Sequence, residues 1–252
     1  MDAITLRPAT PADSERISQI HQDALETYHE FYAAFFQNHP RELMPLATLR
    51  ALNDPQFTFW VAELAGEMAG FVRYRLVVPA NTNANANVVA AQETQGQPLA
   101  SIWAPKEHLK ELWERFNERS VEMDKCREEA VDGKKHFGIS SVSQLLWIPL
   151  HQRKGIGAHL LRHVIDKADA DGLPILIISS AEAHGLYRRM GFESLGTWPI
   201  DNERWADEIA EHEEKLGIAA GVGDGNNLRQ VCRGMSEVED CMIRLPAFRN
   251  AR

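Results

Sequence analysis

The stretch from Val142 to Leu161 constrains the fold of this chain more than any other part of it. It contains the apolar run Leu145–Ile148, which has the length and composition of a β-strand, and Pro149 ends the run because proline brings no N–H to a ladder. Gly155 and Gly157 then allow a sharp turn where an amphipathic helix begins. This order of strand, glycine turn and helix predicts an anion site, most plausibly for phosphate, at the helix N-terminus.

The residues after the turn extend this unit into a strand, a helix and a second strand. Asp171-Gly172 ends the helix, and Pro174–Ile178 is a continuous apolar run of strand length, typical of a buried central strand. The expected buried stripe of the helix is Ile156, Leu160, Leu161, Val164, Ile165 and Ala168. Over this distance, such an order predicts a right-handed βαβ unit.

The N-terminal third predicts a short strand, a helix and a β-hairpin. Ile4–Arg7 alternates as a strand does, and Thr10 followed by Pro11 is typical of a helix start. Phe57–Glu63 and Met68–Val78 are rich in β-branched and aromatic residues and flank a short glycine-containing turn, which indicates an antiparallel hairpin. Alternation along the second strand places two sets of side chains on opposite faces of the sheet. One set is Phe71, Arg73 and Arg75, and the other is Val72, Tyr74 and Leu76.

Between the predicted helix and the hairpin lies an aromatic cluster that has two possible roles. Its members are Tyr28, Phe31, Tyr32, Phe35 and Phe36. Core packing is one interpretation, and the wall of a substrate cleft is the other.

Two polar segments read as insertions into a single domain that covers residues 1–252. The first, at about 79–132, joins an Asn/Ala-rich loop to an acidic amphipathic helix from about Lys106 to Val131. The second, at about 201–238, joins an acidic helix to a glycine-rich loop. This helix is expected near Arg204 to Leu216, with Trp205, Ile209 and Leu216 on its apolar side. The first insertion is expected either to cover a sheet face or edge or to act as a lid over a substrate.

Composition and charge narrow the functional class. The formal net charge of −9 argues against nucleic acid as a partner and is compatible with a cationic substrate, although it also serves solubility. Cys126, Cys232 and Cys241 have neither disulfide-framework nor zinc-ligand spacing, so we expect packed or free thiols and no metal. Without a long apolar run or a basic start, no membrane span or secretory signal is expected; the expected location is cytoplasmic, with the nucleus left open.

A second motif, Ala183–Phe192, follows the second strand of the βαβ unit. Ser179 and Glu182 have capping-box spacing, which predicts a short helix that Gly191 closes. This segment contains Leu186-Tyr187 and ends in Gly191-Phe192, about thirty residues after the glycine turn. A strand over Phe192–Trp198 is expected to follow, with Pro199 beyond its end.

Taken together, the two motifs resemble the GCN5-related N-acetyltransferase (GNAT) superfamily, which transfers an acyl group from acyl-CoA to an amine. Gln152–Gly157 matches the family's Q/R-x-x-G-x-G/A loop, and Ala183–Phe192 matches its A-x-x-L-Y-x-x-x-G-F segment. The resemblance implies an α/β (α+β) fold with a central mixed, mostly antiparallel sheet, splayed at the CoA site and flanked by helices. Ser180 stands where the family frequently has asparagine.

The resemblance also implies roles for particular residues. Backbone N–H groups of Arg153 to Ala158 would bind the CoA pyrophosphate, and the strand that contains Leu146 and Ile148 would pair with the pantetheine amides. Tyr187 would protonate or hold the departing thiolate. The full expected cofactor set is Leu146, Trp147, Ile148, Gln152, Arg153, Lys154, Gly155, Ile156, Gly157, Ala158, Ser180, Ala183 and Tyr187. Acetyl-CoA and an amine of a small molecule or peptide are the implied partners, in a monomer or homodimer.

Several alternatives stay open at this point. The general base is not assigned, with Glu63, His151 and Glu193 as candidates. An acyl-CoA-binding or interaction module on the same fold, without catalysis, fits the same motifs. A Rossmann-type dinucleotide-binding enzyme fits less well, because Leu160 stands where its third small residue belongs.

Overall fold

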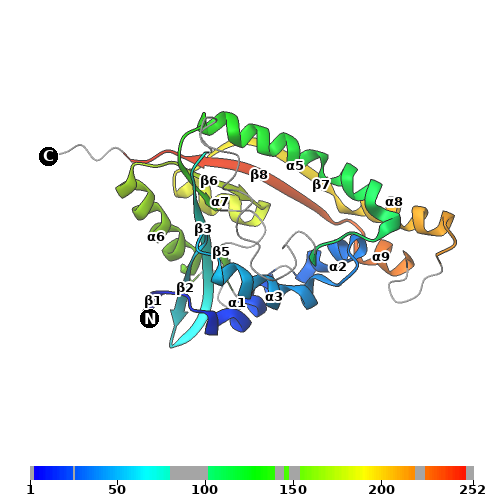
Figure 1. Ribbon diagram of the computed structural model, residues 1–252, viewed down its shortest axis with the longest axis horizontal. Helices are drawn as coiled ribbons and strands as arrows, with labels where there is room; N and C mark the ends of the chain where they lie inside the picture. The colour runs from blue at the N-terminus through cyan, green and yellow to red at the C-terminus, as the bar shows by residue number, and fades with distance from the viewer. Residues whose placement is uncertain are drawn as a thin grey trace.

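A mixed eight-stranded sheet organises the molecule (Figure 1). The computed structural model describes residues 3–24, 26–79, 102–139, 145–147, 154–218 and 225–247. The strands are β1 (Ile4–Pro8), β2 (Thr58–Leu64), β3 (Glu67–Val77), β4 (His136–Ile139), β5 (Leu145–Trp147), β6 (Ile175–Ser179), β7 (Glu193–Asp201) and β8 (Ser236–Arg244). Their order is β1-β2-β3-β4-β6-β8-β7, and β5 pairs with β3 outside this order.

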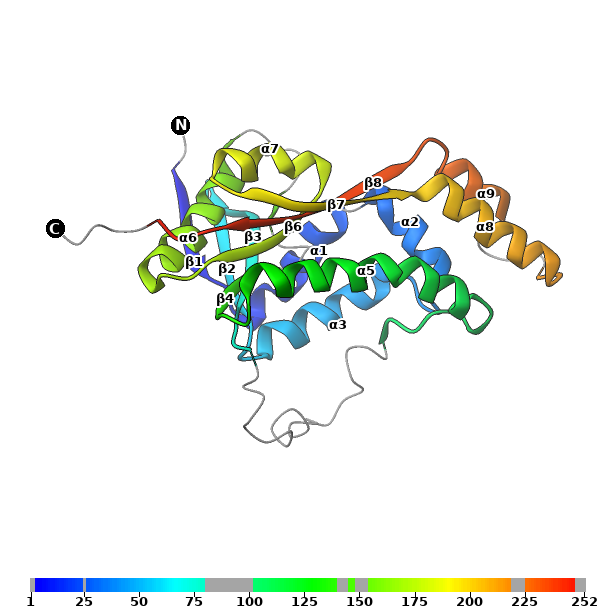
Figure 2. The same cartoon turned by 90° about the horizontal axis from the view of Figure 1, so that it is seen from above.

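Helices cover both faces of this sheet. They are η1 (Pro11–Asp13), α1 (Ser14–Ala24), α2 (Glu26–Phe35), α3 (Pro40–Asn53), η2 (Glu107–Leu109), α5 (Lys110–Val131), α6 (Ile156–Asp171), α7 (Ala181–Arg189), α8 (Asn202–Lys215) and α9 (Gly225–Val231). Figure 2 shows α6 and α7 on one side of the sheet, with α3 and α5 on the other. None of the helices in the described ranges is long and apolar enough to cross a membrane.

The first core lies between α6 and the sheet, and it confirms the predicted helix stripe. Every residue of that stripe is buried, and the stripe packs on Val72 and Tyr74 of β3 and on Phe137 of β4. Phe71 points to the opposite face, where it packs with α1 and α3, as the predicted alternation requires. Leu76 departs from this pattern, since it is 47% exposed beyond the reach of α6.

The predicted βαβ unit is present, but two strands stand where the sequence suggested one. β4 pairs in parallel with β6, through Phe137 opposite Ile175, and α6 connects the two. The run that contains Leu145 forms β5 instead, which pairs with β3 only among the described strands. β3 therefore serves two partners along its length. The pairing of β4 with β6 is the only parallel one in the described sheet, so the expected mostly antiparallel fold is confirmed.

The second core joins the two insertions at the far end of the β7–β8 pair (Figure 2). Its buried members come from α2, η2, α5, β7, α8 and the end of α9: Phe31, Phe35, Leu109, Leu112, Phe116, Ile200, Ala206, Ile209 and Cys232. Phe31 and Phe35 thus follow the core-packing interpretation of the aromatic cluster. Because α5 also packs on β7 and β8, the first insertion covers a sheet face.

Two local predictions, the end of β7 and the burial of Leu216 on α8, were wrong. β7 continues through Pro199 to Asp201, although proline was expected to end the strand after Trp198. β7 lies at the end of the strand order, and an edge strand tolerates a residue without an N–H. Leu216, expected on the buried side of α8, caps that helix and is 53% exposed.

Candidate functional site

The N-terminus of α6 presents unpaired backbone donors from a firmly held helix. Gly155 caps the helix with φ of 84°, a conformation that favours glycine. The first intrahelical bond runs from the His159 N–H to the Gly155 carbonyl at 3.0 Å, so the N–H groups of Ile156, Gly157 and Ala158 precede the helical ladder. They lie at the positive end of the helix dipole. Lys154 is exposed beside them, whereas Gln152 and Arg153 lie outside the described residues.

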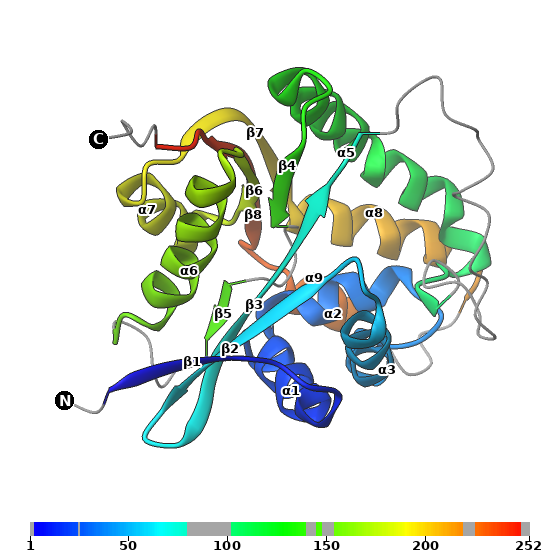
Figure 3. The same cartoon turned by 60° about the vertical axis from the view of Figure 1, so that its left-hand side comes forward.

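The sheet opens next to this helix. β5 pairs through Leu146 with Phe71 and through Trp147 with Gly70, both on β3. Among the described residues, β6 pairs with β4 up to Ile177 and continues to Ser179 against β8. Within the described residues β5 and β6 do not pair, and Figure 3 shows β5 alongside β3 and away from β6. The opening leaves backbone polar groups of two strands for another partner. Ile148 lies outside the described residues.

The start of α7 differs from the predicted capping box. The N-cap is Ser180, and the Ser179 hydroxyl instead donates to the Ser180 carbonyl at 2.8 Å. Ser180 is exposed and its side chain makes no capping hydrogen bond. Ala183 is half-buried against the first core, and Glu182 in the first turn accepts a hydrogen bond from the Tyr28 hydroxyl at 3.4 Å. The first turn of α7 therefore meets α2.

Tyr187 lies inside the first core, on the buried side of α7. It is 4% exposed, and its ring meets the edge of Phe192 with centroids 5.6 Å apart. Burial raises the pKa of Tyr187 well above the usual value for a phenol, so the side chain is neutral at physiological pH.

A buried carboxylate anchors α7 to the sheet. Asp240 on β8 is 5% exposed, accepts from the Ser194 hydroxyl at 2.6 Å and pairs with His184 at 3.0 Å. His184 lies one helical turn before Tyr187, so this contact fixes the helix that carries the tyrosine. No sequence pattern indicates this contact, because the three residues come from three separate elements.

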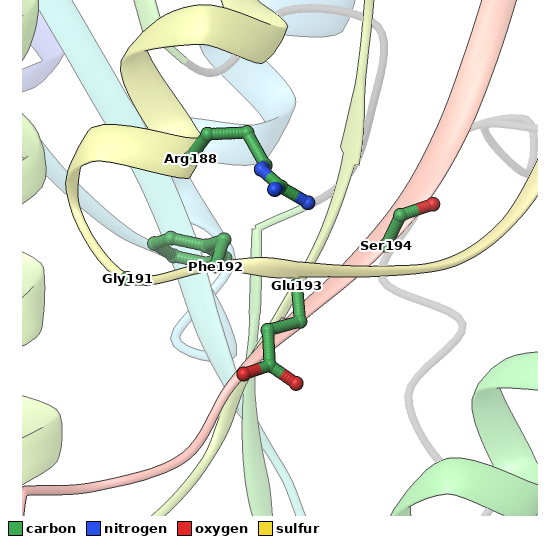
Figure 4. A pocket seen from close by; sticks show the side chains of 5 residues that line it. All are labelled: Arg188, Gly191, Phe192, Glu193 and Ser194. Carbon is green, nitrogen blue, oxygen red and sulfur yellow. The ribbon is translucent and has the colours of Figure 1, made fainter.

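An open hollow of about 510 Å³ lies beside this anchor (Figure 4). Its lining is Arg188, Gly191, Phe192, Glu193 and Ser194. In Figure 4, Arg188 and Ser194 project to one side of β7 and Glu193 to the other. Of the three candidate bases, Glu193 is exposed here, Glu63 accepts a hydrogen bond from Arg7 at 2.7 Å, and His151 lies outside the described residues.

A carboxylate that the sequence did not single out lies on the opposite face of the sheet from α7. Glu237 on β8 accepts from the Asn202 amide at 2.5 Å and from the Tyr32 hydroxyl at 3.5 Å. Burial is the main cause that raises the pKa of Glu237 to about 7. The pKa of Tyr28 is raised to about 12, first by burial and then by the charges of Glu182 and Glu237.

The segment that contains β4, β5, α6, β6, α7 and β7 matches a known family. Residues 135–207 match the family model described as the acetyltransferase (GNAT) domain. This segment of the chain matches the GNAT acetyltransferase family. The resemblance drawn from the glycine turn and the Leu186-Tyr187 segment is thereby confirmed, and the GNAT family uses acetyl-CoA.

Solved GNAT structures share the fold. A polyamine N-acetyltransferase from Drosophila melanogaster is 14% identical with a TM-score of 0.56, over 96% of this chain and 100% of that one. A histone acetyltransferase HPA2 and related acetyltransferase from Corynebacterium glutamicum is 20% identical with a TM-score of 0.53, over 100% of both chains. The PaiA N-acetyltransferase from Thermoplasma acidophilum, solved with coenzyme A, is 10% identical with a TM-score of 0.44, over 96% and 99%. No curated protein matches the chain in sequence.

Metal-ligating side chains do not cluster in this site. Across the described ranges, no group of three or more His, Cys, Asp or Glu residues is arranged to hold an ion. The three cysteines are free thiols, as expected, and Cys241 lies against Cys126 of α5.

Proposed function

We propose that this GNAT protein is an acetyl-CoA-dependent N-acetyltransferase that acts on a primary amine of a small molecule or peptide. The observation that carries the proposal is the unpaired N-terminus of α6 at the edge of an opened sheet. An extended ligand with a pyrophosphate and two amides needs both features side by side. The GNAT match over residues 135–207 supports the same conclusion.

The binding residues follow from this geometry. Backbone N–H groups from Arg153 to Ala158 would hold the pyrophosphate by hydrogen bonds and by the helix dipole. The open edge of β5, at Leu146 and Trp147 and onward to Ile148, would pair with the pantetheine amides. Ser180 and Ala183 at the start of α7 would line the other side. Bound acetyl-CoA supplies an activated thioester at this position.

Transfer requires one bond to form and one to break. The amine nitrogen bonds to the acyl carbon, the carbon–sulfur bond breaks, and the amine proton leaves for a base. Tyr187 would donate a hydrogen bond to the departing sulfur. Because its pKa is raised by burial, whereas an alkyl thiol has a pKa of about 8.5, complete proton transfer from the phenol is unfavourable and hydrogen-bond donation is the favoured role. Holding the reactants together contributes roughly 7–11 kcal/mol.

Glu237 is the base that we favour for the amine proton. A carboxylate with a pKa of about 7 accepts protons effectively at neutral pH. Its hydrogen bond from Tyr32 supports its placement on the acceptor side of the opening, because Tyr32 lies on α2, the helix whose Tyr28 contacts Glu182 in the first turn of α7. Glu63 is engaged by Arg7, and Glu193 is exposed at the edge of the hollow.

The first experiment measures acetyl-CoA binding by calorimetry in the wild type and in a variant with bulky residues at Gly155 and Gly157. We expect micromolar-range binding that this variant loses. Gly172→Ala is the matched control, because Gly172 caps the other end of α6 with φ of 66° and has nothing within 4 Å of an added Cβ. Binding that persists in the double variant would contradict the assigned site.

A second experiment separates the enzyme from a non-catalytic acyl-CoA-binding module. The close packing of Tyr187 on Phe192 also suits a purely structural tyrosine. Release of free thiol from acetyl-CoA would be followed with a panel of amines. Amine-dependent release supports the enzyme, whereas binding without release by any amine favours the module.

A further inference from the structure

Arg73 is a largely buried cation with no acidic partner among the residues that the structure describes. It projects from the middle of β3, with its guanidinium 5.0 Å from the ring centre of Phe57 and 5.8 Å from that of Phe59. Its Nε is buried and has no hydrogen-bond partner in the described structure. Burial lowers the pKa of Arg73 to about 10, and the positive charge of Arg75 adds to this shift.

Other largely buried arginines of the chain, in contrast, form ion pairs with carboxylates. Arg244, whose side chain is 12% exposed, makes two hydrogen bonds to Asp169 at 2.7 and 2.9 Å. Arg119, at 16%, pairs with Glu239 at 3.0 Å. Neither Arg73 nor Arg75 has an ion pair with any residue that the structure describes. A buried charge without a partner is costly, and an aromatic face offsets only part of that cost.

The position of Arg73 in the sheet connects it with the opening. Val72, the preceding residue, pairs with Leu145 of β5, and Arg75 pairs with Gly138 of β4. Arg73 therefore lies on β3 at the point where its partner strand changes, one strand away from the opening. Val72 and Tyr74 face α6, so by alternation Arg73 projects to the other face, together with Phe71.

Glu237 projects to this same face from β8. Its neighbours along the strand, Asp240 and Met242, contact α7 and the first core, whereas Glu239 pairs with α5 on the opposite side. Alternation places Glu237 with Glu239. The sheet face away from α6 thus carries unpartnered cations on the β3 side of the opening and carboxylates on the β8 side.

We propose that Arg73, assisted by Arg75, binds a carboxylate of the acceptor, so that the acceptor is an amine that also carries a carboxylate, as amino acids and peptides do. The inference rests on the proposed acetyl transfer, which it deepens by naming the substrate class. A planar guanidinium matches a planar carboxylate through paired hydrogen bonds, which a lysine ammonium does not reproduce. The acceptor carboxylate supplies the negatively charged partner that Arg73 lacks among the described residues.

The test uses two pairs of amines that differ by one carboxylate: L-lysine with cadaverine, and L-arginine with agmatine. We expect wild-type kcat/KM to favour the carboxylate member of each pair roughly 10- to 100-fold, the range for a charge-assisted contact. Arg73→Met should remove this preference by lowering kcat/KM for the amino acids and leaving cadaverine and agmatine nearly unchanged. Arg73→Lys should retain only part of it.

Two controls separate ligand binding from a folding defect. Arg73→Met should unfold at the same or a higher temperature than the wild type, since it removes an unpaired buried charge without breaking an ion pair. Arg204→Met, which changes an arginine whose side chain is 73% exposed on α8, should leave the preference intact. A drop in melting temperature for Arg73→Met with an unchanged substrate preference would show that Arg73 is structural and overturn the inference.

The failure of this inference is distinguishable from failure of the proposed function. Equal or better acetylation of cadaverine and agmatine overturns the carboxylate site and leaves acetyl transfer standing. If no amine is acetylated, calorimetric binding of L-lysine and cadaverine to the protein still decides. Binding of L-lysine alone, lost in Arg73→Met, supports the site, and equal binding of both overturns it. Preference for O-phosphoethanolamine over β-alanine, added as a third pair, would overturn the carboxylate in favour of a phosphate.

Discussion

The first core lies beneath α6, and the second core lies between the insertions. The two cores differ in how far apart in the sequence their residues lie. Most buried residues of the first core belong to the segment from β4 to the start of β7. The second core combines helices that are far apart in the sequence, near residues 30, 115 and 205. Both bury large apolar side chains, but only the first carries the elements of the proposed CoA site. The comparison suggests that the second core supports the shape of the acceptor side and leaves CoA binding to the first.

The largest expected effect is on stability, from Phe116→Ala in the second core. Phe116 is 2% exposed and packs against Phe31, Phe35, Trp113 and Trp205, with ring centres 5.2 to 5.6 Å apart. We expect a loss of about 3–5 kcal/mol in the free energy of unfolding, measured by denaturant titration. Affinity of the folded variant for acetyl-CoA should change little. A large loss of affinity would break the separation between the two cores.

Leu160→Ala tests the first core in the same way. Leu160 is fully buried on α6, and its loss should cost about 2–5 kcal/mol of unfolding free energy. In contrast to Phe116→Ala, we also expect weaker acetyl-CoA binding in the folded variant, because α6 positions the N–H groups of the site. Calorimetry at a temperature where both variants remain folded measures the difference. Equal affinities would indicate that α6 tolerates the cavity without moving.

Tyr187→Phe asks whether the first core contributes chemistry as well as binding. The change deletes one hydroxyl and retains the ring contact with Phe192. We expect kcat to fall roughly 100-fold, at the low end for a residue that hydrogen-bonds or protonates a leaving group. Acetyl-CoA affinity and melting temperature should be nearly unchanged. An unaffected kcat would remove Tyr187 from catalysis.

Glu237→Gln gives the smallest expected effect and tests the link between the second core and the acceptor side. Burial raises the pKa of Glu237 from 4.5 to about 7 in the folded protein. The folded state therefore binds this proton more tightly than the unfolded state, so wild-type stability from this group is present below pH 4.5 and is lost as the pH rises to about 7.

A glutamine side chain does not titrate, so the variant stays neutral at this position over the whole pH range. It should gain about 1–3 kcal/mol relative to the wild type between pH 4.5 and pH 8, as measured by urea unfolding at both values. The same difference at both pH values would contradict the raised pKa. If Glu237 is also the base, the variant loses the pH dependence of kcat/KM near 7.

Much of the first core was predictable because its signals are local. Helical spacing in α6, alternation in β3 and the glycine turn at Gly155 each report a backbone geometry within a few residues. The GNAT resemblance came from the same stretch and is confirmed. The boundary errors at Ser179 and Pro199 arose because capping and edge position depend on neighbours that the spacing does not show.

By itself, the sequence indicated the order of a strand, a glycine turn and a helix, since steric and periodic constraints act along the chain. Only the tertiary structure decided which distant groups meet. Tyr32 and Glu237 are 205 residues apart, and the partners of Asp240 come from two other elements. Likewise, Arg73 was one charged residue in an alternating strand until the fold showed its guanidinium over two phenylalanine rings, with no carboxylate partner among the described residues. Such pairings depend on chain crossing and burial, which local propensity does not encode.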